Sequence, residues 1–200
     1  KPRPSGLIAL SIDEDDQLIK VGLSNGNQDI MVGTRMGMAI RFSEEDVREM
    51  GRTARGVRSI KLKRDGDKVV GMAVVSDEQP HLLSISENGY GKRTPMVEYL
   101  VHSEDGSTRA QSRGGKGRKD IQTGKRNGLV ADIRSVRDND SLMFITANGM
   151  LVRIAASDIR TIGRNTKGVK VVNLKEDDRL IAAAKVEGVE ESRQASSASS

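Results

Sequence analysis

The sequence predicts an all-β, propeller-like fold built from repeated four-stranded blades. Three observations predict it: a hairpin with a basic second strand recurs, a glycine-rich basic segment recurs in step with it, and acidic turns separate the remaining strands. A repeat of about 50 residues with about four short strands is typical of propeller blades. Since a single blade cannot bury both of its faces, neighbouring blades must stack to make a core.

The hairpins have turn glycines at Gly37, Gly89 and Gly149, which are 52 and 60 residues apart. Asn88-Gly89 and Asn148-Gly149 are Asn-Gly pairs, a strong short-range hairpin signal, and we expect positive φ at both positions of such a turn. Apolar strands precede the three turns at 29–32, 82–85 and 142–145, and basic strands follow within 35–41, 88–93 and 148–153.

The glycine-rich basic segment has equivalent glycines at Gly6, Gly56, Gly117 and Gly168, spaced by 50, 61 and 51 residues. The copies at 51–58 and 163–170 match closely, the copy at 112–118 lies between them, and a degenerate copy lies at 4–10. Acidic turns follow at 13–16, 65–67, 138–140 and 176–178, and further strands at 68–75 and 179–184.

These repeats divide the chain into parts. We expect blades at 15–63, 64–123 and 124–187, the end of a preceding blade at 1–14, and a disordered, serine-rich tail at 188–200. The chain starts inside a repeat, and a closed propeller has about four blades or more, so the sequence predicts a piece of a larger propeller. Helix is expected only as single turns near 43–47 and 157–159, the first with a capping-box spacing.

Composition limits the kind of partner. Lys and Arg total 33 against 28 Asp and Glu, a net charge of +5, which alone is weak evidence for a polyanionic partner. Cysteine is absent, so no disulfide or thiolate metal site can form. No apolar run is long enough for a signal peptide or a membrane span, so we expect a soluble, cytoplasmic protein. With two Phe, two Tyr and no Trp, the chain cannot tile a base-stacking groove, which favours duplex over single-stranded nucleic acid.

Positive charge is concentrated in three stretches at the same part of the repeat, named here the first (48–64), second (109–126) and third (160–175) basic stretches. They carry seven basic and one acidic residue, seven and one, and five and none, respectively. Their net charge is +17, which leaves the rest of the chain at −12. A single run of charge is usually a solvated face, but three runs in register predict an arc of positive charge around one rim. Such a rim suits a curved duplex bound through its phosphates, with sequence-tolerant, salt-sensitive affinity.

The segment Arg113-Gly114-Gly115-Lys116-Gly117 combines charge with backbone freedom. Its glycines let main-chain N–H groups approach a phosphate as an anion nest, while Arg and Lys supply charge. The alternative is a mobile glycine-rich linker. A Walker A loop is excluded here, and also at 163–168, where Val169 follows in place of the required Lys.

Residues 111–117, Gln-Ser-Arg-Gly-Gly-Lys-Gly, resemble the glycine-rich basic box Gln-Arg-Arg-Gly-Gly-Lys-Gly of the DNA gyrase A C-terminal domain. Segments 88–94, 126–130 and 152–169 resemble that family too, and the resemblance extends from residue 1 to about residue 187. It implies a β-pinwheel, a propeller-like fold whose blades exchange strands, in which about six blades wrap duplex DNA around a basic rim and favour negative supercoils. By this resemblance, the chain corresponds to the last three blades and the end of a preceding one.

Two departures limit what the resemblance implies. Ser112 stands where the box has its second basic residue, and this copy lies in a late blade, whereas the signature box of the family belongs to the first. The resemblance therefore implies phosphate contact for Arg113 and Lys116, and not the signature box's role in supercoiling. The other cations of the repeated segments complete the predicted DNA-binding set: Arg118, Lys119, Arg52, Arg55, Arg58, Arg164, Lys167, Lys170, Lys92, Arg93, Arg41 and Arg153.

The resemblance also implies partners, namely the rest of the gyrase A subunit and the gyrase B subunit in a bacterial, chromosome-associated isomerase. ATP and magnesium are expected on other parts of that enzyme, no cofactor is expected for this chain, and no membrane is expected as a partner. The C-terminal domain of the topoisomerase IV A subunit is a close alternative, and the well-kept repeats favour gyrase. An alternative of a different class is a propeller scaffold that binds protein.

No catalytic residue is predicted. Tyr90 lies in a hairpin turn of the repeat, and neither it nor Tyr99 has the helix-turn-helix-like surroundings expected of a DNA-cleaving tyrosine. His81 and His102 have no carboxylates at metal-ligand spacing, and the acidic turns lack the EF-hand spacing needed for Ca²⁺. We therefore expect a binding module that catalyses no reaction itself.

Overall fold

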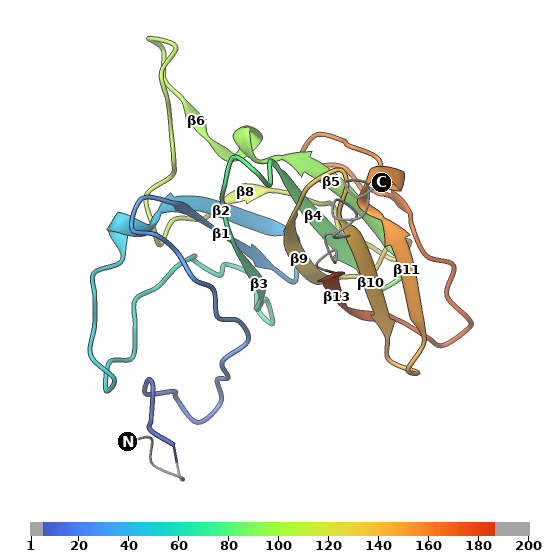
Figure 1. Ribbon diagram of the computed structural model, residues 1–200, viewed down its shortest axis with the longest axis horizontal. Helices are drawn as coiled ribbons and strands as arrows, with labels where there is room; N and C mark the ends of the chain where they lie inside the picture. The colour runs from blue at the N-terminus through green and yellow to red at the C-terminus, as the bar shows by residue number, and fades with distance from the viewer. Residues whose placement is uncertain (1–5, 187–200) are drawn as a thin grey trace, which may run out of the picture.

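The computed structural model describes residues 6–186, and this part of the chain is almost entirely β (Figure 1). Its strands are β1 (Asp29–Thr34), β2 (Met38–Ser43), β3 (Val69–Val74), β4 (His81–Ser86), β5 (Tyr90–Pro95), β6 (Val101–His102), β7 (Thr108–Arg109), β8 (Arg118–Lys119), β9 (Val130–Val136), β10 (Ser141–Thr146), β11 (Leu151–Ala155), β12 (Val169–Lys170) and β13 (Leu180–Val186). Three short 3₁₀ helices are η1 (Glu44–Asp46), η2 (Met96–Tyr99) and η3 (Ala156–Asp158). The predicted all-β fold is confirmed, and none of the helices described is long and apolar enough to cross a membrane. The predicted tail at 188–200 lies outside the described residues.

Three antiparallel sheets form the blades. The first blade has the strand order β3-β1-β2-β8, the second β9-β4-β5-β12, and the third β13-β10-β11. In Figure 1 the first blade lies beside the second, the third flanks the second, and the β6–β7 ribbon projects away from the blades. At the inner edges, β3 packs beside β9 and β9 beside β13.

The blades exchange strands, so the sheets cross the expected boundaries at 63/64 and 123/124. The first blade takes β3 and β8 from the residues expected in the second, and its β2 pairs with β8 through Ala39 and Arg118. The second blade likewise takes β9 and β12 from the third repeat, and Gly91 pairs with Val169. The same part of each later repeat therefore closes the outer edge of the preceding blade. This is the pinwheel arrangement.

The hairpin turns explain why glycine recurs in them. Gly37, Gly89 and Gly149 have φ of 81°, 79° and 81°, whereas Asn88 and Asn148 are not among the residues with positive φ. The expectation of positive φ at both turn positions is therefore wrong, because in each of these turns only the glycine adopts the left-handed conformation. A Cβ at Gly37 would lie 2.1 Å from the Ile121 carbonyl oxygen, and one at Gly89 would lie 2.3 Å from that of Val172. Glycine thus lets the exchanged segment approach the turn.

Apolar residues fill the spaces between blades. Between the first and second blades, Met31, Leu82, Tyr99, Ile121 and Ile133 are buried together. Between the second and third, a larger group contains Leu83, Ile85, Leu142, Phe144 and Ile159. Burial of each large apolar side chain contributes roughly 1.5–3 kcal/mol, so these interfaces hold the blades in a fixed order.

Candidate nucleic-acid interface

The three basic stretches form one continuous band. The first joins the second through backbone hydrogen bonds from Lys61 N to Gly115 O (2.8 Å) and from Gly114 N to Ser59 O (2.8 Å). The second joins the third through Asn165 N to Asp120 O (2.6 Å) and Gln122 N to Thr166 O (2.8 Å). Strand exchange produces this contact, because β8 and β12 lie inside the second and third stretches. The chain therefore brings together charge that is spread over more than a hundred residues of sequence.

Six of the predicted cations are exposed on this band, namely Arg52, Arg55, Arg58, Lys116, Lys167 and Lys170. Arg55 also forms an exposed ion pair with Asp13 at 3.3 Å, and such pairs contribute little because water and salt screen them. The side chains of Lys63 and Lys116 are adjacent, and their contact lowers the pKa of Lys63, with further lowering from desolvation and from the nearby Lys61. Crowded like charges of this kind make the surface attractive to a polyanion.

The side chain of Arg113 is held by two main-chain carbonyl groups. Its Nε donates to the Asp46 carbonyl oxygen (2.9 Å), and a guanidinium NH group donates to the Arg58 carbonyl oxygen (2.7 Å). The side chain thus ties the glycine-rich loop to η1 and to the first basic stretch. Gly117 has φ of 68°, and a Cβ there would lie 2.5 Å from the Ala39 carbonyl oxygen. The loop is therefore shaped by packing against β2, and within it Lys116 is the exposed cation.

Three of the predicted contact residues have side chains that are turned inward. Lys92 is fully buried, Arg93 is nearly so, and Arg41 retains only 15% of its side-chain exposure. Arg41 donates from a guanidinium NH group to the Met96 carbonyl oxygen (3.0 Å), and Arg93 donates from Nε to the Ile159 carbonyl oxygen (2.7 Å). The repeated arginine therefore links one repeat to the next instead of facing a phosphate.

The carboxylates that neutralise these arginines also lie nearby. Arg41 Nε contacts Asp29 Oδ2 at 2.6 Å, and Arg93 pairs with Asp138. Arg153, at the equivalent position of β11, is exposed and donates from Nε to Ser141 Oγ at 2.6 Å. It stays a candidate contact.

The side chains of the remaining predicted cations are partly buried or contact other groups of the protein. Lys119 Nζ donates to the Met36 carbonyl oxygen at 2.8 Å, and burial, with help from Arg64, holds the pKa of Lys119 below its usual range. Arg164 stacks over the Tyr99 ring, with 5.9 Å to the centroid, and a guanidinium NH group lies 3.5 Å from the Lys119 carbonyl oxygen. Arg118 is partly buried in β8. These side chains support the band and present only part of their surface.

One group on the band was missing from the predicted residues. The guanidinium of Arg126 lies 5.2 Å and Lys170 Nζ 5.0 Å from the centre of the Tyr90 ring. Arg126 Nε also donates to the Tyr90 hydroxyl at 3.2 Å, and this hydrogen bond, with the charge of both cations, lowers the pKa of Tyr90. Arg126 belongs to the second basic stretch and Lys170 to the third. The only sequence feature that indicated Arg126 was its place in the second basic stretch.

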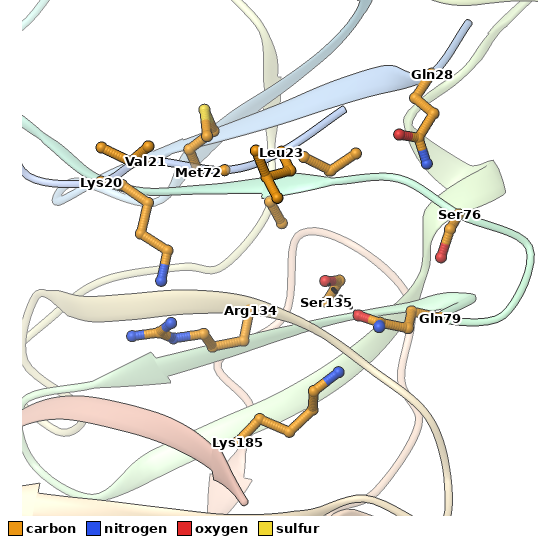
Figure 2. A pocket seen from close by; sticks show the side chains of 13 residues that line it. Lys20, Val21, Leu23, Gln28, Met72, Ser76, Gln79, Arg134, Ser135 and Lys185 are labelled. Atoms are coloured by element: carbon orange, nitrogen blue, oxygen red, sulfur yellow. Dashed lines mark hydrogen bonds between the residues drawn. The ribbon is translucent and has the colours of Figure 1, made fainter. Parts of the chain in front are cut away.

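A separate pocket of about 490 Å³ lies against the inner strands β3, β9 and β13 (Figure 2). Lys20, Arg134 and Lys185 line it, and none of its lining residues belongs to a basic stretch. Arg134 Nε contacts Asp132 Oδ2 at 3.0 Å, and Lys185 Nζ lies 3.9 Å from Asp140 Oδ2. Burial, followed by the charge of Arg134, lowers the pKa of Lys20. Because two of the three cations already face carboxylates, the exposed band offers more unneutralised charge.

Residues 6–186 contain no cluster of three or more His, Asp or Glu side chains placed to hold a metal ion. Of the two tyrosines, Tyr99 is fully buried and donates its hydroxyl proton to Asp120 Oδ1 at 2.6 Å. Burial first, and then the Asp120 carboxylate, raise the pKa of Tyr99 well above its usual range. A phenol held in this way is a poor nucleophile, because the phenolate form is disfavoured.

The sequence matches the family model described as DNA gyrase C-terminal domain, beta-propeller, over residues 28–76, 80–104, 109–137 and 140–187. It is 46% identical over 179 residues to the DNA gyrase A subunit of Haloquadratum walsbyi, covering 89% of this chain and 20% of that protein. It is 41% identical over 186 residues to the DNA gyrase A subunit of Chlamydia muridarum, covering 92% and 21%. The chain thus spans about a fifth of the length of these relatives.

Two solved structures have the same fold. A structure of the DNA gyrase A C-terminal domain superposes with a TM-score of 0.79 at 27% identity, covering 90% of this chain and 58% of that one. A crystal structure of the C-terminal domain of DNA topoisomerase IV superposes with a TM-score of 0.82 at 25% identity, covering 94% and 55%.

Proposed function

The chain belongs to the family of DNA gyrase C-terminal domains, and on that premise we propose that it binds and bends duplex DNA without catalysing a reaction itself. Its parent enzyme is a DNA gyrase, an ATP-dependent type II topoisomerase, in which wrapping of DNA on this domain supports negative supercoiling. Its protein partners in the bacterial cytoplasm are the rest of the gyrase A subunit and the gyrase B subunit. ATP and magnesium act on those other parts, and this chain uses no cofactor.

The continuity of the three basic stretches carries this proposal. Backbone hydrogen bonds join each stretch to the next, and in this proposal the exposed cations of the three stretches offer one path to the duplex. A duplex following that path neutralises several cations in succession and releases the counterions condensed on its phosphates. Bending 20–30 bp costs roughly 1–6 kcal/mol, which several such contacts offset.

The contacts are made to phosphates and not to bases. The exposed members of the band are Arg and Lys side chains on loops and short edge strands, and no helix of the described chain is long enough to enter a major groove. Contacts of this kind position a protein on DNA but carry little sequence information. We therefore propose sequence-tolerant binding by Arg153 of β11 together with the band residues Arg52, Arg55, Arg58, Lys116, Arg118, Arg126, Lys167 and Lys170.

A topoisomerase IV domain is the second candidate, favoured by the superposition on that enzyme's C-terminal domain. The identities of 46% and 41% to two gyrase A subunits favour gyrase, whereas the two solved structures, at 27% and 25% identity, do not separate the candidates. Both candidates bind duplex DNA in this proposal.

Duplex affinity measured against salt concentration tests the proposal. We expect the logarithm of the affinity to fall with the logarithm of salt concentration by about 0.9 for each neutralised phosphate, with stronger binding to a duplex of about 150 bp than to one of about 20 bp. Lys116→Gln with Lys167→Gln should lower the slope by about two. Lys68→Gln with Arg179→Gln, two exposed cations outside the band, should leave it unchanged. Absence of duplex binding at low salt would overturn the proposal and favour a protein-binding scaffold.

A further inference from the structure

A buried polar cluster lies where the second and third basic stretches meet. Lys92 Nζ lies 3.1 Å from Asp120 Oδ1, and both side chains are almost completely inaccessible to water. The Tyr99 hydroxyl donates to Asp120 Oδ1 (2.6 Å) and the Ser84 hydroxyl to Asp120 Oδ2 (2.6 Å). Lys92 also donates to Thr94 Oγ1 at 2.9 Å. The cluster joins strands β4 and β5 of the second blade to the segment that follows β8.

The other two hairpins have apolar residues at the position equivalent to Lys92. Lys92 is opposite Ser84 in its hairpin, and the equivalent positions are Ile40, opposite Val32, and Val152, opposite Phe144. Ile40 is fully buried, so an apolar side chain suffices at this position of a blade. Burying an ion pair costs desolvation that apolar residues avoid. The second blade therefore has a polar cluster that blade formation alone does not require.

The main-chain contacts of Lys92 show what this cluster does. Its Nζ donates to the carbonyl oxygen of Asp120 (2.9 Å), in the second basic stretch, and to that of Gly163 (3.0 Å), in the third. Asn165 N donates to the same Asp120 carbonyl (2.6 Å). Thr94 Oγ1 donates to the Ile162 carbonyl oxygen at 2.9 Å. The buried ammonium of Lys92 is thus hydrogen-bonded to the backbones of both basic stretches.

We propose that Lys92 is a positioning residue that fixes the second and third basic stretches relative to each other and so sets the bend of a duplex that contacts both. The part that concerns DNA rests on the proposed function, whereas the fixed junction is a property of the protein alone. Lys92 touches no phosphate, and it acts through the backbones that carry Lys116 and Lys167.

The test removes both charges at once, because Lys92→Met alone leaves the Asp120 carboxylate buried without its cation. In Lys92→Met/Asp120→Asn we expect the amides of Asn165 and Gln122 to exchange with deuterium at least about tenfold faster than in the wild type, because the junction opens locally. Ile40→Met, the matched change in the first blade, should leave both amides protected. If the double variant fails to fold, Thr94→Val, which removes the hydroxyl between Lys92 and Ile162, gives the same readout.

The second readout is the bend of a duplex of about 20–30 bp carrying a fluorescent dye at each end. We expect the end-to-end distance to lengthen and broaden on the double variant, with affinity within about threefold of wild type since no phosphate contact is removed. Unchanged protection of Asn165 and Gln122, an unchanged bend despite lost protection, or an equal effect of Ile40→Met would each overturn the proposal. Failure of the wild-type chain to bind duplex would overturn the proposed function instead. The exchange experiment would still show whether Lys92 fixes the two basic stretches relative to each other.

Discussion

The first and second strand-exchange joints of this molecule use the same positions of the repeat but different chemistry. At the first, where β8 pairs with β2, the apolar Ile40 packs with Ile60 and Phe42. At the second, where β12 pairs with β5, Lys92 is bonded to Asp120 and to two main-chain carbonyls. A glycine turn and a two-residue ladder are therefore enough to exchange a strand. The polar cluster adds a fixed direction, because hydrogen bonds depend on geometry and apolar contacts do not.

The largest expected effect is on stability, and it separates the two joints. Lys92→Met should lower the free energy of unfolding by about 3–5 kcal/mol, because it leaves the Asp120 carboxylate buried without its cation. Ile40→Met should cost less than about 1.5 kcal/mol, because it keeps volume and polarity. Urea unfolding followed by circular dichroism measures both. Similar losses in the two variants would show that the joints do not differ as described.

A smaller effect is expected where the exchanged segments approach the turns. Gly149→Ala should cost about 1–2 kcal/mol, since its positive φ strains an alanine while nothing lies within 4 Å of the new Cβ. Gly37→Ala and Gly89→Ala should each cost a further 1–3 kcal/mol or so, because the new Cβ would meet a carbonyl oxygen of the exchanged segment at 2.1 Å or 2.3 Å. Denaturation midpoints of the three variants test this order. Equal losses would mean that the exchanged segments move away freely.

The smallest effect distinguishes the two tyrosines by titration. The pKa of Tyr90 is lowered, by its hydrogen bond from Arg126 and by the charges of Arg126 and Lys170, whereas that of Tyr99 is raised by burial and Asp120. Ultraviolet absorbance should therefore show Tyr90 ionising first, below the ordinary value of about 10, and Tyr90→Phe should abolish that step. Bound duplex should raise the pKa of Tyr90, because phosphates nearby disfavour the phenolate. A single step shared by both tyrosines would contradict the structure.

The sign of the Tyr99 effect on stability follows from the same shift. Its folded-state pKa lies above its unfolded value of about 10, so its contribution is fully present below about pH 10 and is lost as the pH rises through the folded-state value. Tyr99→Phe should remove this alkaline loss.

The all-β repeat and the position of the basic stretches could be predicted from the sequence because both depend on local pattern. Turn glycines at Gly37, Gly89 and Gly149 mark the hairpins, and the recurrence of charge between them marks the band. The sequence did not predict which blade receives β8 and β12, because a two-residue ladder such as Val169–Lys170 leaves almost no trace in composition.

The burial of Lys92 and Arg93 could not be predicted from alternation. Adjacent residues of a strand point to opposite faces, and both Lys92 and Arg93 are among the predicted DNA-binding cations. In the structure β5 lies between β4 and β12, both of its faces are covered by neighbouring segments, and both side chains find buried partners. A basic strand beside a turn is therefore a surface signal only when one face of its sheet is open.

The most direct test of the central claim is the linking number of a nicked plasmid that is ligated while the chain is bound. If the band bends duplex DNA along a defined curved path, the linking number should shift in proportion to the amount of bound protein, because a curved path of one hand changes the writhe. Lys116→Gln with Lys167→Gln should reduce the shift at equal protein concentration. Saturated binding with the linking number of free plasmid would contradict the account, because the chain would then bind DNA without wrapping it.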